Sequence, residues 1–569
     1  MTGFRASTLL RSRFCLAALA GLLLALSFPN FGIAGFAWLA PGLLVVASLG
    51  TRGWERFRIG FVGGLIHYLV SLYWLLLIPY RWHSIPLGPA AGWLALGAFL
   101  ALFPAMWLCL AAPPERGSSV TASGQKDFRL WTLEARLIPE TWVGRSLWCL
   151  SGAVIWVAIE MLVARIFTGF PWDLLGVSLY RMVPLIQICS ITGVYGVSFL
   201  IVWGSLSLVC AVFAVLRQPT LRYAWLGETL LPLATILALF SFGFRQIHHA
   251  PAPTRTLKVT FVQPSIPQTL IWDPGSDDER FRQLIQLSEQ AMTNQPDLLL
   301  WPEAAVPKLL RWDKDTFAAV TNLAGSHHVW LIIGADDMEL RADSSGKEIR
   351  EFFNSSFLIS PEGKLVNSYQ KRALVIFGEY IPLVTWLPFI KWFTPIEGGF
   401  TSGKRPVAFK LSDRDVTTSV LICFEDVFPH LAREYADSNT DFVVNITNNG
   451  WFGEGAAQWQ HATSALFRAV ENGLPLLRCS NNGLTCWVDS FGQLRQIFHD
   501  DRGKVYGPGC MTAEVPLLPP GETRPRTFYN QHGDWFGWSC AAWGIFLATR
   551  NAYRHFRNRK NERRGATDH

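Results

Sequence analysis

Three polar side chains that suit nucleophilic catalysis follow one another along this chain of 569 residues. One apolar run, predicted to be a buried strand, ends at Cys423, and a second ends two residues before Glu303. Lys371 lies between them, so acid, lysine and thiol occur in that order. A cysteine at the end of a strand can be a nucleophile, although a lone cysteine there is more often a packing residue. The carboxylate and the lysine favour the catalytic interpretation.

The chemistry of these three groups is complementary. A free thiol has a pKa of about 8.5 and is mostly protonated at neutral pH, so it needs a base or a cation beside it. Glu303 is the predicted base, and Lys371 supplies a cation that stabilises the thiolate and the oxyanion of a tetrahedral intermediate. His461 is an alternative base. Because a histidine at the start of a helix is more often a hydrogen-bonded structural residue, we favour the glutamate and the lysine.

Further motifs surround these residues in order along the chain. They are Val262-Gln263 through Ile266-Pro267-Gln268 to Trp272, Trp301-Pro302-Glu303, Phe377-Gly378-Glu379, and Asn448 through Trp451-Phe452-Gly453 to Trp459-Gln460-His461. The acid, the lysine and the thiol resemble the Glu-Lys-Cys triad of the nitrilase superfamily. With the apolar segments described below, the chain from about Leu26 to Trp535 resembles the apolipoprotein N-acyltransferase family, a membrane-embedded branch of that superfamily.

The resemblance implies an activity. In this family an acyl chain passes from a phospholipid to the cysteine as a thioester, and then to the free α-amine of a diacylglyceryl-cysteine at the N-terminus of an apolipoprotein. The expected partners are therefore a phospholipid donor, a diacylglyceryl-apolipoprotein acceptor and a membrane. Two rival functions are a membrane-anchored amidase or nitrilase that hydrolyses C–N bonds, and a non-catalytic envelope scaffold. The many apolar segments argue against the first rival, and the intact triad argues against the second.

The resemblance also assigns supporting roles. Glu379 and Glu425 are expected to orient the lysine or the leaving group, with solvated surface charges as the alternative. Trp272 matches an aromatic residue at the substrate entrance, although core packing suits it equally, and Trp451 is a second candidate for substrate binding. Phe424 stands where the family commonly has tyrosine, which removes a hydroxyl beside the nucleophile.

The composition is typical of a membrane protein, with 50% hydrophobic and only 16% charged residues. The net charge of +7 does not indicate nucleic-acid binding, because the basic residues gather in short loops and at the end of the chain. Neither a CxxC pair nor an HExxH motif is present, so no metal or cofactor is expected. Eight membrane spans are predicted. They are Phe14 to Phe28, a run to about Gly50, Ile59 to Pro79, Pro86 to Ala112, Leu147 to Ile166, Gly193 to Leu216, Leu230 to Ile247 and Trp535 to Thr549.

Basic residues mark alternate loops, after the second, fourth and sixth spans and in the C-terminal tail. By the positive-inside rule both termini are expected in the cytoplasm. The spans are then expected in the bacterial inner membrane, with the long segment 250–534 in the periplasm. We therefore expect a bundle of about seven spans over residues 1–249, a catalytic domain over 250–534, and a last span with a basic cytoplasmic tail over 535–569. Glu160, inside the fifth span, is predicted to make a structural polar contact.

Residues 250–534 combine strands with helices, which indicates an α/β domain. A helix is predicted over Asp278 to Met292, and Leu257, Val259 and Phe261 alternate with polar residues as in a strand. Further strands are predicted at Leu298 to Trp301, Val329 to Gly334, Phe352 to Ser360, Ser419 to Cys423, Asp441 to Ile446 and Leu474 to Ser480. The nitrilase resemblance supplies the particular architecture, an αββα sandwich.

An aromatic stretch, Leu383 to Phe393, lies between the lysine and the nucleophile. It is too short to span a bilayer and too apolar for an ordinary solvated loop. We predict that its side chains, among them Trp386 and Phe389, enter the outer leaflet and guide a lipid chain toward Cys423. The alternative is an internal loop packed on the sandwich.

Overall fold

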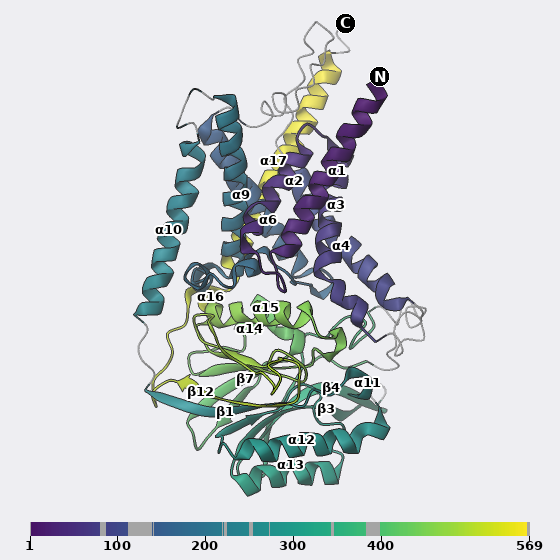
Figure 1. Cartoon of the computed structure of the whole chain (residues 1–569), viewed down its shortest axis with the longest axis vertical. Helices are drawn as coiled ribbons and strands as arrows, with labels where there is room; N and C mark the ends of the chain where they lie inside the picture. Colours follow the sequence, from purple (N-terminus) through teal and green to yellow (C-terminus); the bar gives the residue numbers. More distant parts are fainter. Residues whose placement is uncertain are drawn as a thin grey trace. The chain divides into compact units, whose positions relative to one another are not determined.

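The computed structural model divides the chain into two compact units (Figure 1). The first unit comprises Met1–Leu72, Leu94–Phe244 and Asp534–His569, and the second comprises Tyr73–Trp93 and Arg245–Gly533. The described residues are 2–79, 87–111, 139, 141–218, 220, 223, 225–249, 254–271, 273–342, 346–382 and 399–565.

The first unit is built of helices. The longer ones are α1 (Thr2–Leu26), α2 (Ala40–Ser48), α3 (Gly53–Ser71), α4 (Gly88–Ala111), α6 (Trp142–Val163), α9 (Val194–Arg217), α10 (Leu226–His248) and α17 (Trp535–Gly565). Helices α1 and α3 approach closely, because Gly21 faces the backbone of Gly63 and a larger side chain would clash there. Helix α17 is tied to α6 by an ion pair between Arg165, which follows α6, and Asp534, which precedes α17.

Several helices of the first unit suit a membrane. Among the described residues, α4, α6, α9 and α10 are long and apolar enough to cross a bilayer. Most of the apolar surface of α10 is uncovered within its unit, as expected for a helix that faces lipid. Helix α3 ends at Ser71, and the next residues, Tyr73–Leu77, form a short 3-10 helix, η2, that belongs to the second unit. The N-terminal part of the chain is therefore an apolar helical domain.

The second unit contains two six-stranded sheets. The first has the order β12-β1-β2-β3-β4-β5, and the second β11-β10-β9-β8-β7-β6. The strands of the first are β12 (Gly509–Leu517), β1 (Arg255–Gln263), β2 (Leu298–Leu300), β3 (Trp330–Ala342), β4 (Glu348–Ile359) and β5 (Leu365–Gln370). Those of the second are β11 (Leu494–Ile497), β10 (Cys486–Val488), β9 (Leu476–Ser480), β8 (Phe442–Thr447), β7 (Val416–Ile422) and β6 (Ala408–Leu411).

Each sheet has a parallel centre. Strands β1, β2 and β3 run parallel in one sheet, and β7, β8 and β9 run parallel in the other. Because the carboxyl ends of parallel strands meet at one edge of a sheet, residues that follow such strands come together there. Glu303 follows β2, while Cys423 and Asn448 follow β7 and β8.

Helices cover the two sheets. Helices α12 (Asp277–Met292) and α13 (Lys314–His327) pack on the first sheet, where Leu284 and Val320 join a buried core with Leu299 and Leu331. On the second sheet lie α14 (Pro429–Arg433) and α15 (Ala456–Asn472), on the side away from α12 and α13 (Figure 1). The second unit is thus an αββα sandwich, the α/β architecture expected of a nitrilase-like domain.

Candidate active site

Cys423 occupies a sharp turn at the end of β7. Its φ of 52° lies in the left-handed region, which a non-glycine residue adopts only where the surrounding structure holds it. The turn presents the side chain at the edge of the sheet, as a nucleophile elbow does. The Cys423 carbonyl accepts hydrogen bonds from Asn445 Nδ2 at 3.0 Å and from His461 Nε2 at 3.2 Å. These bonds fix the backbone that carries the thiol.

Glu303 is buried and each of its oxygens has a partner. Oε1 accepts hydrogen bonds from Lys371 Nζ at 3.1 Å and from Asn354 Nδ2 at 2.8 Å. Oε2 accepts from the backbone N–H of Asn448 at 2.9 Å. Donors from three directions therefore hold the carboxylate in one orientation.

Lys371 follows β5 and lies between two carboxylates. Its ammonium donates to Glu379 Oε1 at 2.8 Å as well as to Glu303. Burial by itself would lower the pKa of Lys371, but the charges of Glu303 and Glu379 outweigh it and place the pKa well above its ordinary value. Lys371 is therefore a permanent cation at neutral pH.

The Cys423 thiol interacts electrostatically with the other two groups. Burial and the negative charge of Glu303 raise its pKa to about 12, although the Lys371 cation and the nearby Thr447 hydroxyl oppose the rise. At neutral pH the resting form is accordingly the thiol. A nucleophilic step at this sulfur requires that a base remove the proton as the bond forms, and Glu303 is the carboxylate whose charge acts on the thiol most strongly.

Glu425 and Glu379 are structural parts of this cluster. Glu425 is fully buried and accepts hydrogen bonds from the Tyr369 hydroxyl at 2.7 Å and from the backbone N–H groups of Ile422 at 2.7 Å and Arg372 at 2.6 Å. It thus links the strand before the lysine to the strand before the thiol. The side chain of Glu379 is only 12% exposed. The alternative of solvated surface charges is therefore wrong for both residues.

The His461 imidazole contacts the backbone of the turn that carries Cys423. Its Nε2 lies 2.7 Å from Asp426 Oδ1, and its Nδ1 lies 3.0 Å from Asn449 Oδ1. Burial and the nearby Arg478 lower the pKa of the imidazole, against the opposing effect of Asp426. With both ring nitrogens engaged in this way, the histidine holds the Cys423 carbonyl in place.

Sequence reasoning missed Asn354, which donates hydrogen bonds of 2.8 Å to both Glu303 and Glu379. Its only signal was a polar residue inside the predicted strand Phe352 to Ser360. Asp336 lies directly opposite Asn354 in the β3–β4 pair and was missed as well. Burial and the charges of Glu303 and Glu379 raise the pKa of Asp336 to about 7.

The aromatic candidates fall in different places. Trp451 is partly buried in a short turn, η10 (Gly450–Phe452), which follows Asn448 and so begins beside the carboxylate of Glu303. Trp272, Trp386 and Phe389 lie outside the described residues.

The η2 segment packs against the same turn. Trp74, which is buried, donates a hydrogen bond of 2.9 Å from its indole nitrogen to Gln460 Oε1. Its ring meets the Phe452 ring edge-on, with the centroids 4.4 Å apart. Residues that follow α3 in the sequence are thereby part of the second unit.

Comparisons with known proteins agree with this arrangement. Residues 258–514 match the family model for carbon-nitrogen hydrolases, and residues 20–207 match that for the apolipoprotein N-acyltransferase N-terminal domain. An apolipoprotein N-acyltransferase of Geobacter metallireducens is 34% identical over 541 residues, which cover 95% of this chain and 95% of the relative. The chain belongs to the apolipoprotein N-acyltransferase family.

Further relatives extend the comparison. The apolipoprotein N-acyltransferase of Brucella melitensis is 32% identical and covers 84% of this chain and 86% of its own length. Among solved structures, an amidase from Nesterenkonia sp. covers 47% of this chain and 93% of its own, at 18% identity and a TM-score of 0.34. Membership of the apolipoprotein N-acyltransferase family rests on the sequence relatives.

Proposed function

We propose that this enzyme transfers a fatty acyl chain from a phospholipid to the α-amine of an N-terminal diacylglyceryl-cysteine, with Glu303, Lys371 and Cys423 as its catalytic residues. The observation that carries the proposal is a buried ion pair together with a strained cysteine turn. Lys371 Nζ lies 3.1 Å from Glu303 Oε1, and the turn is the one at Cys423. Family membership supports the choice of substrates, and the geometry supports the roles of the three residues.

In the first half-reaction the Cys423 sulfur attacks the carbonyl carbon of a phospholipid ester while Glu303 takes the thiol proton. The Lys371 cation stabilises the oxyanion that develops. The tetrahedral intermediate then collapses, the ester C–O bond breaks, and Glu303 returns the proton to the leaving alkoxide. The products are a thioester on Cys423 and a lysophospholipid.

In the second half-reaction the neutral α-amine of the acceptor attacks the thioester carbon. Glu303 takes one amine proton, and Lys371 again stabilises the oxyanion. Collapse breaks the C–S bond, forms the amide and releases the sulfur, to which Glu303 returns a proton. Glu379, which also bonds Lys371, and Glu425, which ties the two strand ends together, serve as supporting residues that position the triad.

The proposal places eight spans in the inner membrane with both termini in the cytoplasm. Residues 1–249 provide about seven of these spans, residues 535–569 provide the last span with its basic tail, and residues 250–534 form the periplasmic catalytic domain. The alternation of basic loops supports this orientation.

Four further aromatic residues are proposed to bind the lipid. The arm Leu383 to Phe393 brings Trp386 and Phe389 into the outer leaflet, and Trp272 and Trp451 line the entrance to Cys423. What supports this is the residue types, because tryptophan settles at a headgroup boundary while phenylalanine and leucine enter the acyl region.

Intact-mass analysis of the purified protein after incubation with phospholipid tests the function. We expect one fatty-acyl adduct that hydroxylamine removes, because a thiol and a lipid ester form a thioester, and that a diacylglyceryl-cysteine peptide discharges as an N-acyl product. Cys423→Ala is expected to form none. An adduct that persists in Cys423→Ala would refute the nucleophile. Turnover of a small amide without acylation by phospholipid would favour an amidase.

A further inference from the structure

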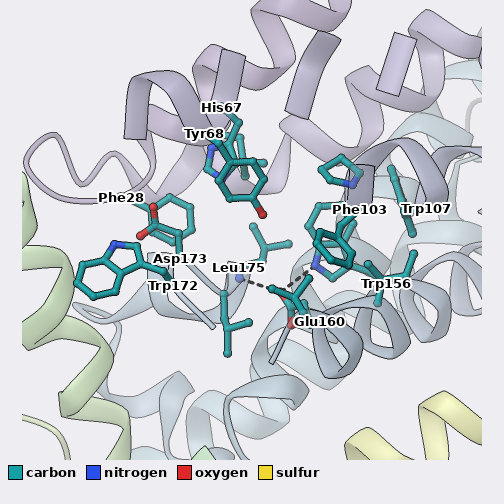
Figure 2. Close-up of a pocket in the computed structure, with 15 residues that line it drawn as sticks. Phe28, His67, Tyr68, Phe103, Trp107, Trp156, Glu160, Trp172, Asp173 and Leu175 are labelled. Atoms are coloured by element: carbon teal, nitrogen blue, oxygen red, sulfur yellow. Dashed lines mark hydrogen bonds between the residues drawn. The ribbon is translucent and has the colours of Figure 1, made fainter. Parts of the chain in front are cut away.

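A cavity inside the helical unit holds two carboxyl groups and an imidazole that the proposed mechanism does not use. It lies among α1, α3, α4, α6 and the loop that follows α6 (Figure 2). Glu160 comes from α6, Asp173 from the loop and His67 from α3. The fifteen described residues that line the cavity include no lysine or arginine.

Glu160 is only half satisfied by the protein. Its Oε1 accepts hydrogen bonds from the indole N–H of Trp156 at 2.9 Å and from the backbone N–H of Leu175 at 2.8 Å (Figure 2). This is the structural contact that the sequence indicated. The Ser198 hydroxyl also interacts with the carboxylate. The second oxygen, Oε2, is buried, and none of the described residues offers it a donor with hydrogen-bond geometry. A carboxylate oxygen in such a place requires a donor.

His67 and Asp173 also favour a ligand that forms hydrogen bonds or carries a positive charge. His67 is 2% exposed, and its Nδ1 also has no hydrogen-bond partner among the described residues. Asp173 is buried and accepts one hydrogen bond, from the Ser71 hydroxyl. Two buried carboxyl groups thus share one cavity. Among the described residues that line it, protonated His67 is the sole side chain that could supply a positive charge.

The walls are aromatic. Figure 2 shows Phe28, Tyr68 and Trp172 on one side of the cavity and Phe103, Trp107 and Trp156 on the other. The faces of such rings attract cations, and the attraction strengthens where water is excluded. Carboxylates and ring faces together form the kind of surface that binds an organic ammonium group.

The size of the cavity selects among ammonium groups. Its free volume is about 40 Å³, and a water-sized group needs about 10–15 Å³ on this measure. About three such groups fit, which matches the tip of an aminoethyl chain, –CH2–CH2–NH3⁺. A trimethylammonium group is bulkier and donates no hydrogen bond to Glu160 Oε2.

We propose that this cavity binds the protonated primary amine of an amphiphile. Glu160 Oε2 and Asp173 accept hydrogen bonds from the ammonium, and the ring faces enclose its methylene groups. The source of the amine rests on the proposed function, whose two substrates offer it: an aminoethyl phospholipid headgroup, or the α-ammonium of diacylglyceryl-cysteine. The amine site itself does not depend on the chemistry at Cys423.

The test measures binding in a protein that cannot turn over. Cys423→Ala in detergent micelles is offered equal amounts of an aminoethyl phospholipid and its N-trimethyl analogue, and native mass spectrometry counts the lipid retained. We expect a preference of about tenfold for the primary amine, as suits a charge-assisted hydrogen bond. Adding Glu160→Gln should abolish the preference, since glutamine keeps an acceptor for Trp156 and Leu175 but loses the charge.

Controls separate the site from its surroundings. Glu55→Gln, at the start of α3 and outside the cavity lining, should keep the preference. A diacylglyceryl-cysteine peptide with a free or an acetylated amine is the second arm, and dependence on Glu160 in this arm alone would assign the site to the acceptor. Equal retention of both lipids together with equal retention of both peptides overturns the proposal. So does a primary-amine preference that survives Glu160→Gln.

Discussion

The backbone N–H of Asn448 donates a hydrogen bond of 2.9 Å to Oε2 of Glu303. Glu303 follows a strand of one sheet and Asn448 a strand of the other, so this bond joins the carboxyl ends of the two sheets where the candidate catalytic residues lie. The backbone donor leaves Oε1 to Lys371 and Asn354. The position of the carboxylate therefore depends on the packing of the whole sandwich.

Glu303→Gln and Lys371→Met are expected to change the intrinsic reactivity of Cys423 in opposite directions. The Glu303 carboxylate raises the pKa of the thiol and the Lys371 cation lowers it. Removing the carboxylate therefore increases the thiolate fraction at a given pH, and removing the ammonium decreases it. The rate of alkylation by iodoacetamide, followed by intact mass, measures this. In the unmodified protein the rate should still rise above about pH 9, because burial and the Glu303 charge raise the pKa of the thiol to about 12.

Acyl transfer from phospholipid is expected to fall in both of these variants. Lys371→Met loses an oxyanion donor, which typically costs about 2.7–4 kcal/mol of barrier, a factor of ~10²–10³. Glu303→Gln loses the base. Faster alkylation together with slower acyl transfer in Glu303→Gln would show two separate effects of Glu303. Its charge raises the pKa of the thiol, and its carboxylate takes the proton during acyl transfer. Near-normal acyl transfer in that variant would return His461 to consideration as the base.

Asn354→Leu is expected to lower kcat by a factor of ~10–100. The substitution removes two hydrogen bonds to carboxylates, each worth about 1.5–3 kcal/mol, and lets Glu303 and Glu379 shift about Lys371. Steady-state kinetics with a phospholipid donor measure the effect, and KM should stay constant because Asn354 is buried. Asn367→Leu, at an exposed asparagine of β5, is the matched control. A change confined to KM would instead indicate a direct contact with the lipid.

Trp74→Phe is expected to loosen η2 from the rest of the second unit. Phenylalanine keeps a ring beside Phe452 but loses the hydrogen bond to Gln460, at a cost of about 0.5–1.5 kcal/mol. Thermal unfolding of the purified protein should show a lower midpoint. Trp54→Phe, at a tryptophan that is 70% exposed, should leave the midpoint unchanged. Equal midpoints for both variants would contradict a stabilising role for Trp74.

Changing Trp386, Phe389 and Phe393 together to serine tests the proposed lipid-guiding arm. If the arm delivers lipid from the bilayer, acylation of Cys423 from vesicle phospholipid should fall while acylation from a short water-soluble thiol-reactive ester is retained. Loss with both donors would mean that these side chains only hold the domain together. Intact mass reads both reactions.

The local sequence pattern was sufficient to predict the central strands and the residues at which they end. Ser419 to Cys423 is predicted as a strand, and β7 ends at Ile422; Asp278 to Met292 is predicted as a helix, and α12 covers Asp277–Met292. Central strands of a covered sheet are continuous apolar runs, so they are visible in the sequence, and the polar residues that follow them stand out. Glu303 and Cys423 were found in this way.

Edge elements were decided by tertiary structure. β12 pairs with β1 from the far end of the domain and contains Pro516, which is tolerated because the strand lies at an edge. Such strands are short or half exposed and have no apolar run of their own. Similarly, the third span was predicted to run from Ile59 to Pro79. Yet the helix ends at Ser71, and Trp74 bonds Gln460, a partner distant in sequence.

The states of the charged residues also depended on the fold. The sequence named Glu425 and Glu379 but left them as either supporting or solvated groups. Burial and the bonds from Tyr369 and Lys371 decide between these alternatives, since a carboxylate is held inside only where donors converge on it. The cavity around Glu160 is a stronger case, because it is lined by three helices from earlier in the sequence together with α6 and the loop that follows α6. The sequence by itself determined the types and the order of the candidate reacting groups, and packing determined which donors face each of them.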